Sequence, residues 1–182
     1  MQLSFKRLRE GQRGFSLLEM MLATVILLVG LVAIAQLVPA SILMNFRNRT
    51  DSSALVFAQR QLDQMVDQPL TVNSFTDVLG NTCQLGDPTS PNSVQGSTVT
   101  SINNQTLILF NTPNPFPAPT SGYGFTYTDP NDPSGATYDV RWAVIITGNG
   151  SAASSKRFIL GVRQVGGNGY FQPITLDTMV GK

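Results

Sequence analysis

The chain contains no histidine and only one cysteine, Cys83, among its 182 residues. Without histidine it lacks the side chain most often used as a general base or a zinc ligand. A single cysteine cannot close an intramolecular disulfide. The sequence also has no G-x-S-x-G, S-x-x-K or P-loop motif. We therefore expect a non-enzymatic protein without a cofactor. We expect Cys83 to be an inert or partly buried thiol, the alternatives being an intermolecular or a metal-binding role.

Charged residues are also scarce, at 13% of the chain against 42% apolar residues, which is typical of a globular protein. Residues 1–14 hold four basic residues, Lys6, Arg7, Arg9 and Arg13, against Glu10 alone. The remaining chain has eight Lys and Arg against ten Asp and Glu, so it offers no general attraction to nucleic acid phosphates. Nucleic acid is therefore not an expected partner, and only a local basic patch would bind it.

A long apolar run follows the basic segment, from Phe15 to Val38, with few polar interruptions. As a helix, its 24 residues extend for about 36 Å, enough to cross a hydrocarbon core of about 30 Å. The basic residues before it place the N-terminus in the cytoplasm by the positive-inside rule. We therefore predict one transmembrane segment over residues 15–38, with the C-terminal part of the chain in the periplasm or outside the cell.

Glu19 is the one ionisable residue within this apolar run. An ionisable side chain in a membrane-length segment costs a few kcal/mol and by default indicates a function. A simpler interpretation is that Glu19 lies in the first turn of the helix, where a negative charge gains about 0.3–1 kcal/mol from the helix dipole.

The junction Gly14-Phe15-Ser16-Leu17-Leu18-Glu19 resembles the G-F-[ST]-L-[IL]-E motif of type IV prepilins and pseudopilins. The resemblance implies that residues 1–14 are a leader. A prepilin peptidase would cut after Gly14 on the cytoplasmic side and methylate the new N-terminus at Phe15. It also implies that Glu19 pairs with the N-terminal amine of a neighbouring subunit during assembly. Without the resemblance, residues 15–38 would be an uncleaved signal anchor.

Gly30 and Pro39 are the weak points of the expected helix, because glycine lowers helix propensity and proline removes a backbone donor. In major pilins, which the junction resembles, a stretch between glycine and proline can unwind on assembly. We predict helix flexibility at these two positions. Alternatively, Pro39 marks the point where the helix leaves the membrane.

The helix is expected to continue to residue 68, before Pro69, giving one long helix over residues 15–68. Apolar residues recur at three- and four-residue steps over 54–66, as in a helix packed on a sheet, after a break in the pattern at 45–53. This segment resembles the corresponding helix of minor pilins and minor pseudopilins rather than of major pilins.

Residues 69–182 are predicted to form a β-rich extracytoplasmic domain, which makes the fold class α+β, a long helix packed on an antiparallel sheet. Asn103-Asn104 is expected to form a tight turn, residues 148–155 a flexible connection, and residues 111–122 a proline-rich loop. The expected strands are 94–100, 105–110, 123–128, 138–147, 156–165 and 171–179.

Two polar groups in this domain are weak site candidates. Asp129, Asn131 and Asp132 offer oxygen ligands for calcium, although such clusters are usually turns. Four basic residues are expected to form a stripe on a solvated face of the sheet, with a DNA or anion contact as the alternative; they are Arg141, Lys156, Arg157 and Arg163.

Together these features predict a minor pilin of a type IV pilus. Its partners would be other pilin or pseudopilin subunits, the prepilin peptidase and N-methyltransferase, and the assembly platform of the bacterial inner membrane. It would cross that membrane once, with a cytoplasmic N-terminus, before entering a filament. The alternatives are a minor pseudopilin of type II secretion and, from another class, a filament-borne adhesin or DNA-binding module.

Overall fold

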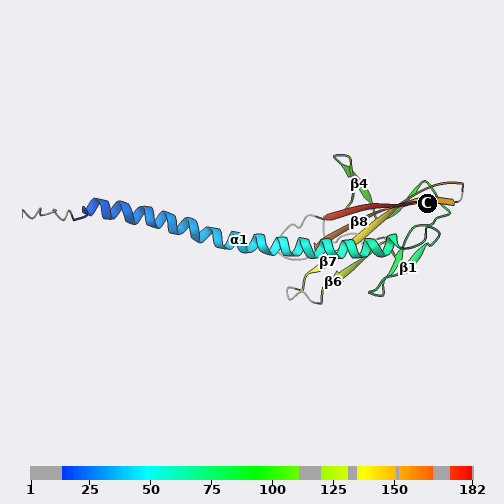
Figure 1. Cartoon of the computed structure of the whole chain (residues 1–182), viewed down its shortest axis with the longest axis horizontal. Coiled ribbons are helices and arrows are strands. Elements are labelled where there is room, and N and C mark those ends of the chain that lie inside the picture. The colour runs from blue at the N-terminus through cyan, green and yellow to red at the C-terminus, as the bar shows by residue number, and fades with distance from the viewer. Residues whose placement is uncertain (1–13, 111–119, 131–134, 151, 166–172, 182) are drawn as a thin grey trace, which may run out of the picture. The chain divides into compact units, whose positions relative to one another are not determined.

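The structure is a computed structural model that describes residues 14–110, 120–130, 135–150, 152–165 and 173–181. It contains one helix followed by nine strands (Figure 1). By its internal contacts the chain divides into residues 1–46 and residues 47–182. Each unit is described by itself.

The helix α1 (Leu17–Val66) begins after Ser16 and includes Pro39 without a break. Its N-terminal part consists almost entirely of apolar residues, and their side chains are exposed all round: Leu17 is 79% exposed and Val32 53%. Its most apolar 18-residue window has a mean hydropathy of 2.6, so by length and composition the helix can cross a membrane. It ends at Val66, three residues before Pro69.

The main sheet has five antiparallel strands: β3 (Ser93–Gly96), β6 (Gly124–Thr128), β7 (Thr137–Asn149), β8 (Ala152–Val165) and β9 (Ile174–Gly181). The order is β3-β7-β8-β9, and β6 pairs with the other half of the β7 edge that β3 occupies. The predicted α+β class, with a long helix and an antiparallel sheet, is confirmed.

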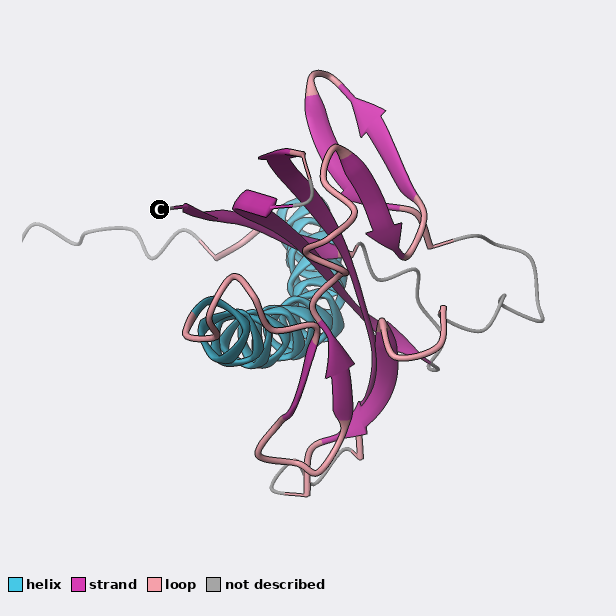
Figure 2. Cartoon of the chain, turned by 90° about the vertical axis from the view of Figure 1, so that its right-hand side faces the viewer, coloured by secondary structure: helices cyan, strands magenta, loops and turns pink. Residues whose placement is uncertain are grey.

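The main core lies between one face of this sheet and the C-terminal part of α1 (Figure 2). The helix contributes Ala54, Phe57, Ala58, Leu62 and Met65, which follow the helical period. The sheet contributes alternate residues of β7 and β8: Tyr138, Val140, Trp142, Val144, Ile146, Phe158, Leu160 and Val162. Burying each large apolar side chain stabilises the fold by about 1.5–3 kcal/mol, so this helix face holds the domain together.

A hairpin of β4 (Val99–Ile102) and β5 (Gln105–Ile108) covers part of the opposite face of the sheet (Figure 2). The predicted turn is confirmed, because Asn103 and Asn104 have φ angles of 51° and 63°, as a tight hairpin turn requires. The hairpin packs closely over Gly161, where a Cβ atom would lie 2.8 Å from the Cβ of Ile108. A further small hairpin comprises β1 (Ser74–Thr76) and β2 (Thr82–Gln84).

Two of the predicted segments are wrong. The single strand expected over residues 94–100 is divided into β3 and β4, because Gly96 has a φ of 101° and ends the first strand. The flexible connection expected over residues 148–155 is mostly strand, with a register shift between Thr147 and Gly148 that accommodates the short turn. Phe171 and residues 111–119 lie outside the described residues.

The predicted basic stripe is also wrong, because its members have different surroundings. Arg141 is 5% exposed, and its Nε and Nη2 atoms donate to the Asp139 carboxylate at 2.8–3.0 Å. Arg163 lies 3.8 Å from the same carboxylate, and both guanidinium groups contact the Phe110 ring, at 5.4 and 4.8 Å from its centroid. Burial lowers the pKa of Arg163 below its usual value, and Asp139 opposes this shift.

The other two members of the stripe point to opposite faces of β8. Lys156 is 1% exposed on the helix side, where its Nζ donates to the carbonyl of Val72 at 2.7 Å, and burial lowers its pKa. Arg157 lies on the other face and forms an ion pair with Asp177. Sequence alternation alone does not reveal that both faces of β7 and β8 are largely covered.

We predict that Asp139→Asn lowers the free energy of unfolding by about 3–5 kcal/mol, because it leaves buried guanidinium groups without their carboxylate. The matched variant Asp177→Asn removes a half-exposed carboxylate from its ion pair with Arg157 and should cost about 0–1 kcal/mol. Urea unfolding of the full chain in detergent measures both, with the fluorescence of the buried and only tryptophan, Trp142, as the probe. Equal losses in the two variants would contradict the assignment.

Candidate functional site

The Gly14-Phe15 junction lies outside regular secondary structure, directly before α1. Both residues are exposed, and no other atom lies within 4 Å of the position that a Cβ of Gly14 would take. The helix starts with Ser16, whose Oγ accepts a hydrogen bond from the Leu18 N–H at 3.2 Å. The Ser16 carbonyl accepts the first helical bond, from Met20, at 3.1 Å. A protease therefore finds an accessible, non-helical peptide bond before a well-capped helix.

Glu19 lies in the first turn of α1, exposed and among exposed apolar side chains. Ser16 and Glu19 have the S-x-x-E spacing of a capping box, a local signal that the sequence interpretation overlooked. Within the described residues, Glu19 has no ion-pair partner. The helix dipole favours its charge, yet the carboxylate remains available to a group from outside the chain.

Gly30 and Pro39 both lie within the continuous helix. Gly30 is exposed, and a Cβ at its position would meet no atom within 4 Å, so close packing in this chain does not require glycine there. Pro39 has no N–H to donate to the carbonyl of Ala35. Two residues beyond it, the Ser41 hydroxyl donates to the Leu37 carbonyl at 2.8 Å. Neither residue ends the helix.

Cys83 is fully buried in β2 behind the C-terminal part of α1. The side-chain amide of Gln61 donates to its Sγ at 3.4 Å. Burial raises the pKa of the Cys83 thiol to about 12, and the nearby Asp77 carboxylate acts in the same direction. The group is therefore a neutral, unreactive thiol at physiological pH.

Of the three calcium candidates, only Asp129 belongs to the described residues. Asn131 and Asp132 lie outside them. Residues 14–110, 120–130, 135–150, 152–165 and 173–181 contain no group of three His, Cys, Asp or Glu side chains that could hold a metal ion.

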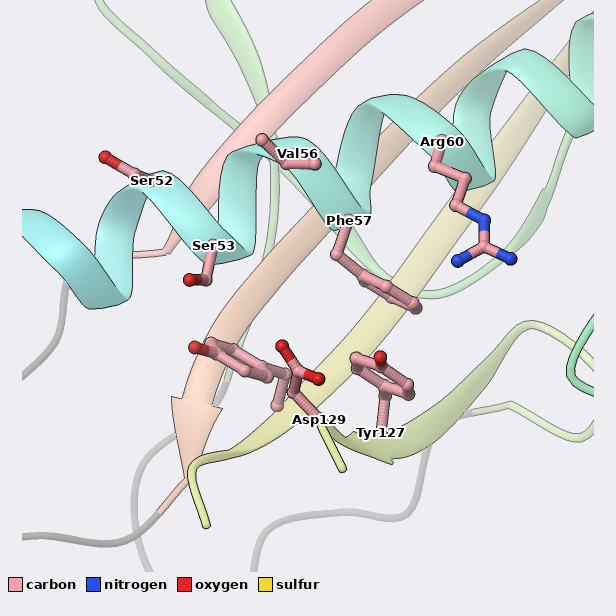
Figure 3. A pocket seen from close by; sticks show the side chains of 8 residues that line it. Ser52, Ser53, Val56, Phe57, Arg60, Tyr127 and Asp129 are labelled. Carbon is pink, nitrogen blue, oxygen red and sulfur yellow. The ribbon is translucent and has the colours of Figure 1, made fainter. Parts of the chain in front are cut away.

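Asp129 instead lines a cleft of about 390 Å³ between α1 and the strands β6 and β7 (Figure 3). The cleft was not predicted, because its residues come from segments far apart in the sequence. They are Ser52, Ser53, Val56, Phe57, Arg60, Tyr127, Asp129 and Tyr138. Phe57 and Tyr127 stack with ring centroids 4.1 Å apart. Desolvation and then Asp129 raise the pKa of Tyr127, whereas Arg60 lowers it, so both charged groups lie near this phenol.

The chain matches the family described as the prokaryotic N-terminal methylation motif, over residues 9–35. This segment includes the accessible junction at Gly14, the capping Ser16 and Glu19. No curated protein and no solved structure matches the chain.

We predict that Cys83 does not react with a maleimide at pH 7–8 in the folded protein and reacts fully in urea. Because burial raises its pKa, the neutral thiol stabilises the fold up to about pH 9, the ordinary value for cysteine. Above pH 9 the thiol ionises in the unfolded chain first, so this contribution is lost progressively towards pH 12. Labelling followed by mass spectrometry measures the reactivity, and rapid modification of the native protein at pH 7 would contradict the burial.

Proposed function

Because the chain carries the N-terminal signature of type IV pilins and pseudopilins, we propose that it is a minor pilin of a type IV pilus. The observation that carries the proposal is an exposed Gly14-Phe15 junction followed by an apolar helix with a single carboxylate in its first turn. The motif implies processing by a prepilin peptidase and assembly with other pilin subunits. The pilus, the minor role and the residue assignments below are our proposal.

Cleavage after Gly14 removes the basic leader and leaves Phe15 as the methylated N-terminus. Glycine suits this position because it has no side chain to obstruct the close approach of the peptidase backbone. Ser16 remains in the mature chain, so the cap on the first turn of α1 survives processing. The new N-terminal amine and Glu19 then lie close together along the same chain end.

Glu19 acts between subunits in this proposal. Where α1 is surrounded by other apolar helices, both its carboxylate and the N-terminal amine of a neighbour would be costly to leave alone. Pairing them relieves both charges and favours the addition of a subunit that lies next to the first. Within a single chain Glu19 also interacts with the helix dipole, but that interaction alone gives no reason for a second subunit.

The exposed apolar side chains of the N-terminal part of α1 support anchoring in the inner membrane before assembly. The basic leader favours a cytoplasmic N-terminus. On entry into the filament the same side chains exchange lipid for neighbouring helices. The β-rich unit is then presented outside the membrane, and the protein is a substrate of processing enzymes rather than an enzyme.

The minor role rests on the helical segment at residues 54–65, which resembles minor rather than major subunits. A minor pseudopilin of type II secretion is the second candidate, favoured by the same segment. A DNA-binding or adhesive role through the basic stripe loses its support, because Arg141 and Lys156 are buried and Arg157 is paired with Asp177.

We predict that mass spectrometry of sheared filaments finds an N-methylated peptide that starts at Phe15, at low abundance relative to the main subunit. Gly14→Leu should leave the chain uncut, with its N-terminus at Met1, because the side chain obstructs the peptidase. Gly11→Leu is the matched control and should be processed. Detection of the mature form only in membranes would favour the pseudopilin, and an uncut wild-type chain would refute processing.

Glu19→Gln is expected to be cut and methylated normally but to enter filaments about tenfold less or worse, since an unpaired amine among apolar helices costs a few kcal/mol. Ser16→Ala separates the two roles of this turn. It removes the cap, at a cost of about 1 kcal/mol, but keeps the carboxylate, so incorporation should remain near normal. Quantitative immunoblots of sheared filaments and membranes measure both variants. An equal loss with Ser16→Ala would show that Glu19 acts only on its own helix.

A further inference from the structure

The cleft between α1 and the end of β6 belongs wholly to the β-rich unit, so it can be considered without reference to processing or assembly (Figure 3). Its volume of about 390 Å³ lies within the range of small-molecule sites, about 300–1,000 Å³. The helix supplies one wall through residues on neighbouring turns, and the strands supply the other through Tyr127, Asp129 and Tyr138.

Aromatic and aliphatic surfaces make up the apolar part of the lining. Phe57 and Tyr127 stack with nearly parallel rings, 8° apart, and the stack holds the helix wall against the end of β6. Phe57 is 7% exposed and Tyr138 1%, so these two rings belong to the core and form a rigid floor. Val56 is 65% exposed and gives the cleft an open apolar rim. A ligand with C–H faces could rest against these surfaces.

The polar part of the lining combines one cation, one anion and several hydroxyls. Asp129 is half-buried and accepts hydrogen bonds, whereas the exposed guanidinium of Arg60 donates them. Figure 3 shows Arg60 and Asp129 at different sides of Tyr127 along the cleft. Ser52 contributes only as an acceptor, because its hydroxyl already donates to the Asn48 carbonyl at 2.8 Å.

Opposite charges in one cleft decide against a ligand with a net charge. An anion would be attracted by Arg60 and repelled by Asp129, and a simple cation would meet the reverse. A ring with several hydroxyls meets neither penalty, because each hydroxyl both donates and accepts. Its hydroxyls can donate to the Asp129 carboxylate and accept from the Arg60 guanidinium, while its C–H faces contact Val56 and the aromatic rings.

We propose that this cleft binds a neutral saccharide, with Asp129 and Arg60 holding neighbouring hydroxyls and Val56, Phe57 and Tyr127 forming the apolar surface. The open rim suits one or two sugar units of a longer glycan rather than an enclosed small molecule. The proposal does not rest on the pilin assignment, since it concerns residues of the β-rich unit alone.

The test uses the full chain in micelles of dodecylphosphocholine, which has no sugar headgroup to occupy the cleft. The probes are the methyl glycosides of glucose, galactose, mannose and N-acetylglucosamine, followed by saturation-transfer NMR. For ligands of this size we expect at least one probe to bind with a Kd of about 1 mM. Arg60→Ala and Asp129→Asn should each weaken that binding about tenfold, since each loses a hydrogen bond to a charged group.

Two variants control for charge alone. Asp63→Asn and Arg47→Ala change exposed residues of α1 that do not line the cleft, and they should bind the probe as the wild type does. The fluorescence of Trp142 confirms that each variant is folded. Failure of all four glycosides to bind would overturn the proposal, and so would binding that survives both cleft variants. Preference for a zwitterion such as triglycine over every glycoside would also overturn it. Each of these outcomes leaves the Phe15 and Glu19 experiments unaffected.

Discussion

One continuous helix has to satisfy two different surroundings, and the rest of the structure follows from this constraint. In its N-terminal part every face of α1 is apolar and exposed, which requires lipid or other apolar helices around it. In its C-terminal part only one face is apolar, and this face covers the sheet through Phe57, Ala58 and Met65. The change of pattern along one element therefore separates the segment that needs outside partners from the segment that completes its own fold.

The sheet depends on burial of both its faces, and the two faces differ chemically. The face towards the helix is filled by large apolar side chains such as Trp142, whose indole N–H donates to the carbonyl of Gln84 at 2.8 Å. The opposite face is closed by the β4–β5 hairpin, with a carboxylate and two guanidinium groups next to Phe110. A charged cluster in this position adds direction to the packing, because Asp139 accepts from Arg141 in only one geometry.

Local signals allowed most elements to be predicted, but layered contacts did not appear in the sequence. The Asn103-Asn104 turn and the strand at Tyr138 have short-range patterns that are decisive by themselves. The burial of Arg141 and Lys156 depends on a hairpin and a loop that come from elsewhere in the chain. The cleft at Asp129 likewise joins α1 to the end of β6, and no spacing along the sequence indicates it. Ser16 is different, since its capping signal was present and was overlooked.

The absence of a disulfide has a mechanical consequence. A filament subunit carries tension along its length, and a covalent cross-link would limit how far its β-rich unit extends. Here the sheet relies on the ladder between β7 and β8, which pairs Thr137 with Val165 at one end and Asn149 with Ala152 at the other. A ladder of this length can share a load across many backbone hydrogen bonds. With no disulfide to break, a unit opened by force can close again without a redox step.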